Sequence, residues 1–514
     1  RPNRAKREQA MSGREAALFL CRDTSGSVAR RATESSGAGA NPAAVRNRLI
    51  SVSLCLLLFA APATAAAAAH KVPLSTESTT IALTLPGIRP RKIELDAPTL
   101  FHTITTDFFL QDDGTMYVQS GDIPAMWLRD SSAQTYPYLR FINSYQQLDF
   151  VTHGVIERNA RNILIDSYAN AFTAGYKVWE EKWEVDSLAY AATLLTGYWQ
   201  LTHDRAILTP RLRWAIVHIV ENYECEQQHR SCSHYRSRFL PNHGSGADYD
   251  DTGMIWGAFR PSDDAVRFPF NIPQELFAAR ALNALARFID DVYGDSALAF
   301  RARELAAAVR WGVDRFGRVY DFRHGWIYAY EVDGKGGVAL MDDANLPDLV
   351  AMSLFQLTTG DDPLYQSTRR FSLSTANPYY YRGRYAAGLG SPHTPTGWVW
   401  PLALAATGIT ASSLNEVVES LEQLRAIDGE KGLLYESVDP NRPWHFTRSS
   451  FGWANAMYAE LVFRSVADLH EVTAATDEFA LLPDRIHTPH ITAPMEKWRA
   501  AATIYSALSR ILRD

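Results

Sequence analysis

Apolar residues recur every three or four positions along much of this chain, which is the period of an amphipathic helix. In residues 188–199 the apolar positions are Leu188, Ala191, Ala192, Leu195, Tyr198 and Trp199. The same period predicts further helices over residues 212–223, 274–294, 298–314, 346–358, 399–408, 412–426 and 450–468. Strand signals are few. The best is Gly325-Trp-Ile-Tyr-Ala-Tyr-Glu-Val332, which we expect to be one arm of a hairpin.

A long succession of helices fits two architectures. In an (α/α)₆ barrel, pairs of helices form an inner and an outer ring, and the loops at one end make the active site. An α-solenoid would show a repeat of fixed period, and none is visible in this sequence. The pattern therefore predicts an all-α fold, an (α/α)₆ barrel over residues 71–468, followed by a helical tail over residues 469–514.

The first 70 residues lack this pattern and predict a leader with a signal peptide. A charged stretch at Arg46–Arg48 precedes the apolar run 49–60 and the small-residue site Ala63-Thr-Ala65. We expect cleavage after Ala65, a secreted or periplasmic protein, and no stable membrane insertion after cleavage. The alternative is an uncleaved anchor, although the run is short for a membrane span and Pro62 lies near its end.

Composition and charge narrow the range of partners. The net charge is −6, and residues 1–48 hold 10 Lys and Arg against 4 Asp and Glu, so the remainder is more acidic than the whole chain. An acidic protein without a basic stripe argues against nucleic acid as a partner. Aromatic residues make up 11% of the chain. We assign about half of them to the core and expect others to line a cleft, because a sugar ring stacks on an aromatic face.

Two cysteines, Cys225 and Cys232, follow the predicted leader, and both lie in a polar segment. In an oxidising compartment they are expected to form a disulfide, with two unpaired thiols as the alternative. Their spacing is not that of a zinc site, and the sequence has no H-E-x-x-H motif, P-loop or dinucleotide-binding glycine motif. The sequence therefore predicts no metal and no cofactor.

The segments without helical period combine Asp, Arg, Trp, Gly and Pro. They are residues 121–134, 182–187, 252–265, 340–345, 388–395, 434–437 and 446–455. A single Asp is usually a helix cap or a surface charge. A concentration of carboxylates with Trp and Arg fits glycoside hydrolysis better, because one carboxylic acid must protonate the leaving oxygen while a second carboxylate activates water or attacks directly.

These segments resemble glycoside hydrolase family 125, the exo-α-1,6-mannosidases. The stretch Asp122-Ile-Pro-Ala-Met-Trp-Leu-Arg-Asp-Ser131 is similar to the family's opening signature. Later blocks of the family, in the same order, resemble Phe259-Arg-Pro-Ser-Asp-Asp-Ala265, Met341-Asp-Asp-Ala-Asn345, Gly390-Ser-Pro-His-Thr-Pro395 and Phe451-Gly-Trp-Ala-Asn455. The resemblance covers about residues 88–465. It implies an (α/α)₆ catalytic domain, no required metal, and hydrolysis with inversion at the terminal α-mannoside of a mannose-containing glycan.

The resemblance also implies roles for two carboxylic acids. The general acid matches Asp263, with Asp264 as the alternative, and the general base matches Glu436. An acid must hold its proton at working pH, and we expect the neighbouring Asp264, with Trp256 and Phe259, to raise the pKa of Asp263. Inversion predicts about 6.5–9.5 Å between the two carboxyl groups.

The remaining residues of these blocks are candidates for binding the substrate. Trp127 and Trp453 are candidates for stacking on a sugar ring. The candidates for binding hydroxyl groups or lining the site are Asp122, Arg129, Asp130, Asp186, Asp264, Asp342, Asp343, His393 and Arg448. For each residue the alternative is structural support, such as a salt bridge from Arg129 to an Asp, or Asp343 as a cap.

Two other functions fit the same sequence. The first is a different (α/α)₆ enzyme, an α-glucosidase, a trehalase-like enzyme or a polysaccharide lyase, although a lyase would favour a basic cleft and this chain is acidic. The second is a non-catalytic glycan-binding protein. That reading would be favoured if Asp263 or Glu436 were absent, and both are present.

Overall fold

A computed structural model describes residues 79–83, 91–95, 97–429 and 432–465 of the chain. The chain divides into two compact units, Arg1–Lys71 and Val72–Asp514. All described residues belong to the second unit. The predicted signal peptide, its cleavage site and the predicted tail 469–514 lie outside the described residues, and they stay predictions.

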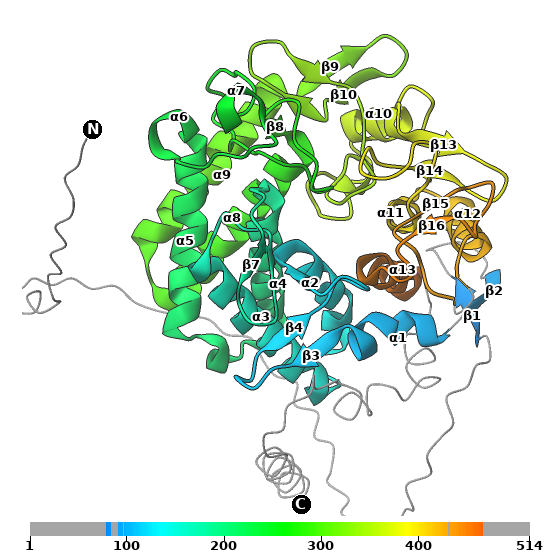
Figure 1. Ribbon diagram of the computed structural model, residues 1–514, viewed down its shortest axis with the longest axis horizontal. Coiled ribbons are helices and arrows are strands. Elements are labelled where there is room, and N and C mark those ends of the chain that lie inside the picture. The colour runs from blue at the N-terminus through cyan, green and yellow to red at the C-terminus, as the bar shows by residue number, and fades with distance from the viewer. Residues whose placement is uncertain (1–78, 84–90, 96, 430–431, 466–514) are drawn as a thin grey trace, which may run out of the picture. The chain divides into compact units, whose positions relative to one another are not determined.

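The helices of the second unit form two layers (Figure 1). The inner layer consists of α2 (Leu128–Thr135), α4 (Val185–Thr202), α8 (Ile272–Tyr293), α11 (Pro401–Ile409) and α13 (Gly452–Ser465). Within it, α2 packs on α4, α4 on α8, α11 on α13, and α13 back on α2. The outer layer consists of α1 (Ala97–Thr106), α3 (Gln146–Ile165), α5 (Pro210–Gln227), α9 (Ser296–Phe316), α10 (Pro363–Ser372) and α12 (Leu414–Ala426). This is the predicted (α/α)₆ arrangement.

Aromatic side chains fill the centre of the inner layer. The Tyr190 ring contacts those of Phe277, Phe355 and Trp453, with centroids 4.7, 5.9 and 6.1 Å apart. Since these residues come from α4, α8, α13 and the segment before α10, the contacts join inner elements far apart in sequence. Such edge-to-face pairs add to the stabilisation from apolar burial.

The predicted helix over residues 346–358 is wrong. The segment contains only the 3₁₀ turn η3 (Val350–Met352). Aspartate side chains take up its backbone donors: Asp342 Oδ1 accepts from Leu349 N at 3.0 Å, and Asp348 Oδ1 accepts from Ala351 N at 2.6 Å. Pro347 also lacks an N–H and disfavours helical geometry at the residue before it. The segment packs between α8 and α11, where a regular barrel would have an inner helix.

The other predicted helices are confirmed, but the periodicity missed α1, α2, α3 and α10. The most informative omission is α2, which begins inside the segment 121–134 that we expected to be a loop. Every residue of α2 is buried, although Arg129, Asp130 and Gln134 are polar. A helix buried on all sides by other elements has no amphipathic period to detect.

The strands are short and mostly paired as hairpins. The strand prediction at residues 325–332 is confirmed in part: β10 is the arm of a hairpin with β9, but the chain then breaks, and β11 belongs to another sheet, between β12 and β8. The strands are β1 (Thr79–Leu83), β2 (Arg91–Leu95), β3 (Phe108–Leu110), β4 (Met116–Val118), β5 (Met126–Trp127), β6 (Ala171–Phe172), β7 (Val178–Glu180), β8 (Phe270–Asn271), β9 (Arg318–Asp321), β10 (Gly325–Tyr328), β11 (Glu331–Val332), β12 (Val338–Ala339), β13 (Tyr380–Arg382), β14 (Ala387–Leu389), β15 (Ser437–Val438) and β16 (Phe446–Thr447). Short helices complete the fold: η1 (Tyr136–Phe141), η2 (Arg205–Ile207), α6 (His229–Cys232) and α7 (Pro241–Gly244). Among the described helices, none combines the length and the apolar character that a membrane span requires.

Cys225 and Cys232 form a disulfide between the end of α5 and the end of α6, with Cα atoms 5.2 Å apart. The loop that it closes carries His229, whose ring stacks on Trp256 with centroids 3.6 Å apart. The Nδ1 atom of His229 contacts Glu226 Oε2 at 2.7 Å. The disulfide thus braces a loop that packs against the segment 252–265.

Replacing both cysteines by serine should destabilise the protein by about 2–3 kcal/mol, because the closed loop spans a sequence separation of only 7. Urea denaturation of the variant and the parent protein measures this difference. Peptide mapping without reduction should recover Cys225 and Cys232 in one cross-linked fragment. Two separately alkylated peptides would contradict the pairing.

Candidate active site

The N-terminal ends of three inner helices carry much of the predicted chemistry. Arg129 and Asp130 lie in the first turn of α2, Asp186 lies in the first turn of α4, and Trp453 begins α13. The exposed N–H groups at a helix N-terminus favour nearby negative charge. The geometry therefore suits a site that collects carboxylates at one end of the inner layer.

Arg129 is the centre of this cluster. Its Nη1 atom donates to Glu184 Oε2 at 2.7 Å and to Asp186 Oδ2 at 3.5 Å, and its Nη2 atom donates to Asp263 Oδ1 at 2.9 Å. Its Nε atom lies 3.4 Å from Asp130 Oδ2. One buried guanidinium thus faces four carboxyl groups, which come from three segments of the chain.

The carboxyl groups around Arg129 differ in their affinity for protons. Burial raises the pKa of Asp130 and of Asp186 to about 6, in spite of the Arg129 charge. Burial also raises the pKa of Glu184 well above its ordinary value. Because one positive charge cannot balance four negative charges in a dry site, some of these groups hold protons near neutral pH.

Asp263 behaves in the opposite way, so the expectation of a raised pKa for this residue is wrong for the free protein. Burial favours protonation, but the Arg129 charge, a hydrogen bond from Glu184, and Lys182 and His393 outweigh it and hold the pKa of Asp263 below its ordinary value. The adjacent Asp264 therefore does not determine the pKa of Asp263, because residues distant in sequence outweigh it. Of the two neighbouring carboxyl groups Glu184 and Asp263, Glu184 therefore has the higher pKa.

A backbone connection sets Asp263 beside Arg129. Glu184 and Phe259 form a parallel bridge, and the Phe259 N–H donates to the Trp183 carbonyl at 3.1 Å. From there the chain turns back, with a left-handed φ of +63° at Asp263 itself. The Asn170 amide donates to Asp263 Oδ1 at 3.3 Å. Asp263 remains partly accessible, with 17% of its side chain exposed.

Glu436 approaches from a separate loop, directly before β15. Its residue is 8% exposed, and burial raises its pKa against the opposing effects of Thr447, His393 and Arg448. The Arg448 Nε atom lies 3.8 Å from Glu436 Oε1, while its Nη1 atom donates to Asp122 Oδ1 at 3.3 Å. A carboxylate with a raised pKa is a stronger base than an exposed one.

His393 lies between the two sets of carboxyl groups. Its Nδ1 atom is 3.4 Å from Asp264 Oδ1. Partial burial lowers its pKa, but the Asp264 hydrogen bond and the charges of Asp263, Asp264 and Glu436 outweigh this effect and raise it to about 9. At neutral pH His393 is therefore a cation that faces both candidate catalytic residues.

Several candidates for sugar binding are enclosed in the protein instead. Trp453 is 1% exposed, and the Arg129 guanidinium carbon lies 5.5 Å from its ring centroid. The Trp453 ring therefore packs against Arg129, and it is too buried to stack on a sugar as predicted. Asp342 holds backbone donors of its own segment, and Asp343 Oδ1 accepts from Asn345. Both aspartates are fully buried, which fits the structural alternative.

Trp127 differs from Trp453 in its surroundings. It lies on β5 in a small apolar cluster apart from the main core, with Ala125 and Ala171. Its buried Nε1 atom has no hydrogen-bond partner in the described part of the protein. An unsatisfied indole N–H beside the carboxylate cluster is a donor that a ligand oxygen can satisfy.

Sequence reasoning did not single out Glu184, Asn170 or Lys182. Glu184 is fully buried and binds Arg129, and Asn170 donates to both Glu184 and Asp263. Only Glu184 and Lys182 lay in a segment that had attracted attention, residues 182–187. Glu184 immediately precedes α4 and lies two residues before Asp186. This position at a helix N-terminus was the one feature of the sequence that could have identified Glu184 as a site residue.

The described residues contain no group of three or more His, Cys, Asp and Glu side chains arranged to hold a metal ion. Four carboxyl groups of the site instead surround the guanidinium of Arg129.

Replacing Arg129 by Gln should destabilise the protein by about 3–5 kcal/mol near neutral pH, because buried carboxylates lose their partner. The folded-state pKa of Asp263 should then rise from its lowered value, and those of Asp130, Glu184 and Asp186 should rise further above the unfolded values. The folded variant consequently binds more protons, so its deficit should grow as pH rises from about 5 to 8 and shrink on acidification. Urea denaturation at both pH values measures the deficit.

The matched control for this prediction is Arg129→Lys, which keeps the charge but lacks the planar fork of donors. It should lose less stability than Arg129→Gln at each pH. A deficit of the Gln variant that does not change with pH would contradict the proposed electrostatic role of Arg129.

Comparisons with a family model, a curated protein and solved structures all identify relatives of this chain. The family model of metal-independent α-mannosidases (GH125) matches residues 93–463. The chain is 33% identical over 386 residues to the "Meiotically up-regulated gene 157 protein" of Schizosaccharomyces pombe, covering 67% of this chain and 75% of that protein.

A solved structure from Streptococcus pneumoniae is similar to this one with a TM-score of 0.69 and 35% identity, over 72% of this chain and 93% of that chain. It is described as a metal-independent α-mannosidase in a non-productive complex with α-1,6-mannobiose. The family model, over residues 93–463, spans nearly all of the described barrel and includes the carboxyl groups around Arg129. The chain belongs to glycoside hydrolase family 125, the metal-independent α-mannosidases.

Proposed function

We propose that this protein is an exo-acting α-mannosidase that removes terminal non-reducing mannose, with a preference for α-1,6 linkages, and inverts the anomeric configuration. The observation that carries the proposal is the pairing of two separate carboxyl environments: Asp263 within the Arg129 cluster, and Glu436 on another loop. The family membership and the mannobiose bound by the Streptococcus relative support the substrate.

Asp263 is the proposed general acid. We place the proton of the Glu184–Asp263 pair on Glu184 in the free protein, because the pKa of Glu184 is raised and that of Asp263 is lowered. As negative charge develops on the leaving oxygen, this proton passes to Asp263, and Asp263 donates it to that oxygen. Arg129 contacts both carboxyl groups and stabilises the charge left behind. Asp264, which faces His393, is the alternative acid.

Glu436 is the proposed general base. It removes a proton from a water molecule that attacks the anomeric carbon from the face opposite the leaving group. The predicted separation of about 6.5–9.5 Å between the two carboxyl groups leaves room for that water. His393 and Arg448 provide positive charge beside Glu436. His393 and the exposed pair Asp122 and Arg448 are the proposed contacts for sugar hydroxyl groups.

The protein is also proposed to act outside the cytoplasm, as a secreted or periplasmic enzyme. The disulfide between Cys225 and Cys232 supports this proposal, because such bonds persist in oxidising compartments.

Hydrolysis of α-1,2-, α-1,3- and α-1,6-linked mannobiose and of the matching α-glucobioses tests the proposed specificity. We expect release of mannose from the α-1,6-linked substrate first, with and without EDTA. Faster hydrolysis of an α-glucoside would overturn the assignment of the substrate. Loss of activity on chelation would overturn the proposal that no metal takes part.

The first sugar released from an α-mannoside should be β-mannose, because inversion proceeds through a single displacement. Proton NMR of the anomeric region during the first minutes, before mutarotation, distinguishes the two anomers. Initial α-mannose would mean retention of configuration, and Glu436 would then have to act as a nucleophile.

The two catalytic roles predict different effects of substitution. Asp263→Asn should slow a mannobiose about 10²–10⁴-fold and spare an aryl mannoside with a good leaving group, which needs little protonation. Glu436→Gln should slow both substrates alike, since it acts on the water. The ratio of kcat/KM values for the two substrates measures the difference.

Asp264→Asn is the matched control for these variants. If Asp264→Asn rather than Asp263→Asn produces the dependence on the leaving group, the role of the acid passes to Asp264. Equal slowing of both substrates by all three variants would contradict the proposed division of roles.

A further inference from the structure

A polar cavity of about 360 Å³ lies in the inner layer, away from the carboxylate cluster. Two helix faces supply most of its lining. From α4 come Thr193, Thr196, Gly197 and Gln200, and from α8 come Arg280, Asn283, Ala284 and Arg287. Each set follows the spacing i, i+3, i+4, i+7, so each is one continuous face of its helix.

These two faces lie at the same level of the inner layer, 8 to 15 residues after the start of α4 and of α8. At a rise of 1.5 Å per residue they lie about 12–22 Å along the axis from the N-terminal ends of these helices, where α4 carries Asp186. Inner helices normally turn apolar side chains toward their neighbours. Here both helices instead carry a polar stripe, which runs from the buried Thr193 and Thr196 to the exposed Gln200, Asn283 and Arg287, so the cavity opens to solvent.

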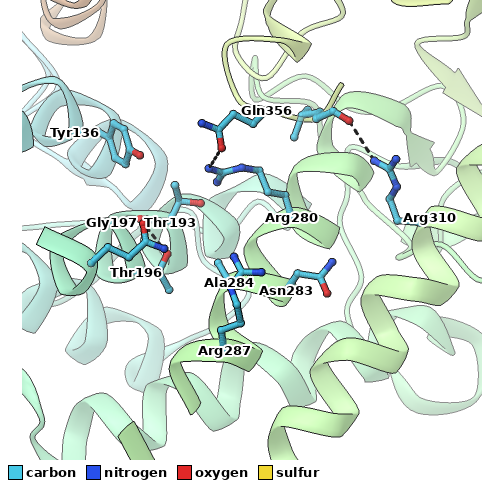
Figure 2. Close-up of a pocket in the computed structure, with 12 residues that line it drawn as sticks. Tyr136, Thr193, Thr196, Gly197, Arg280, Asn283, Ala284, Arg287, Arg310 and Gln356 are labelled. Carbon is cyan, nitrogen blue, oxygen red and sulfur yellow. Dashed lines mark hydrogen bonds between the residues drawn. The ribbon is translucent and has the colours of Figure 1, made fainter. Parts of the chain in front are cut away.

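The cavity is lined with positive charge and no negative charge. Its remaining lining residues are Tyr136, Arg310, Gln356 and Leu357, so neither Asp nor Glu is among them. Arg280 Nη2 donates to the neutral Gln356 Oε1 at 3.0 Å, and Arg310 Nη1 donates to the Leu357 carbonyl at 3.2 Å (Figure 2). In the described part of the protein, none of the three lining arginines forms an ion pair.

Three buried arginines elsewhere in the protein have acidic partners. Arg129, Arg260 and Arg369 each contact a carboxylate directly. Arg280, by contrast, has no acidic partner among the described residues: its burial and the like charge of Arg287 lower its pKa against the opposing effect of Tyr136. Two uncompensated guanidinium groups beside one cavity favour the binding of an anion, because oxyanions form short, charge-assisted hydrogen bonds with guanidinium groups.

We propose that this cavity binds a small molecule carrying a phosphate group, with Arg280 and Arg287 holding the oxyanion. Figure 2 shows both arginines with Asn283 along α8, opposite Thr193 and Thr196 of α4. These neutral side chains offer donors and acceptors for hydroxyl groups. The volume lies within the range of small-molecule sites and exceeds what a bare phosphate needs, so a phosphorylated sugar fits the chemistry of the lining.

The cavity is distinct from the proposed catalytic site. A second, smaller cavity of about 80 Å³ lies between them and is lined by the aromatic residues Tyr190, Phe277, Phe355 and Trp453. Tyr136, Thr193, Arg280 and Gln356 line both cavities. The aromatic group separates the arginines from Arg129, so a bound anion would not contact the catalytic carboxyl groups.

Isothermal titration calorimetry of the full chain at pH 7 and fixed ionic strength tests the proposal, using inorganic phosphate, mannose 6-phosphate and mannose as probes. Both phosphate compounds should bind. Equal affinities would identify a free phosphate group as the ligand, and tighter binding of mannose 6-phosphate would identify a phosphorylated sugar. Mannose alone reports any binding at the catalytic site, so its contribution is subtracted.

Arg287→Gln should weaken the binding of both phosphate compounds about tenfold or more, and adding Arg280→Gln should weaken it further. Arg287 is exposed, so its variant should fold normally, which circular dichroism checks. Arg323→Gln, an exposed arginine next to β9, is the matched control and should leave the affinity unchanged. No binding of phosphate, or equal binding by the pocket variants and the control, would overturn the proposal. The measurement does not depend on hydrolysis, so it fails or succeeds separately from the proposed function.

Discussion

The ion-pair cluster around Arg129 is the interaction on which the rest of the site depends. A guanidinium buried among four carboxyl groups requires that these groups share protons, since otherwise the site would hold a large uncompensated negative charge. The cluster also joins α2, the start of α4 and the segment 252–265. The same contacts therefore fix the geometry of the site and decide which carboxyl group holds a proton.

Much of the fold could be predicted from the sequence, because helices with one apolar face show a clear period. The exceptions share a physical cause. The period missed α2 since neighbours bury it on every side, and it misassigned residues 346–358 because Asp342 and Asp348 capture backbone donors that a helix would use. The spacing of apolar residues along the chain shows neither that a helix is buried on all sides nor that a buried side chain binds the N–H groups that a helix would use.

The sequence predicted which segments of the chain form the site, but it did not predict the role of each residue in them. The blocks around Arg129, Asp186 and Asp263 meet as the resemblance implies. The environment of Asp263, however, is set by Arg129 and Glu184, which are distant in sequence, rather than by the adjacent Asp264. Likewise, Trp453 is a residue type that often stacks on sugars. Its contact with Arg129 follows instead from the packing of α13 on α2.

The contact between α13 and α2 has a consequence for how the chain is made. These two helices are separated by more than 300 residues, and α13 is the last described element of the barrel. A chain that leaves the ribosome N-terminus first cannot cover the side of α2 that faces α13 until α13 has been synthesised. At typical elongation rates of about 5–20 residues per second, this side of α2 lacks its partner helix for tens of seconds. In a closed ring whose first and last inner helices are neighbours, the last packing surface of the ring therefore forms only at the end of synthesis.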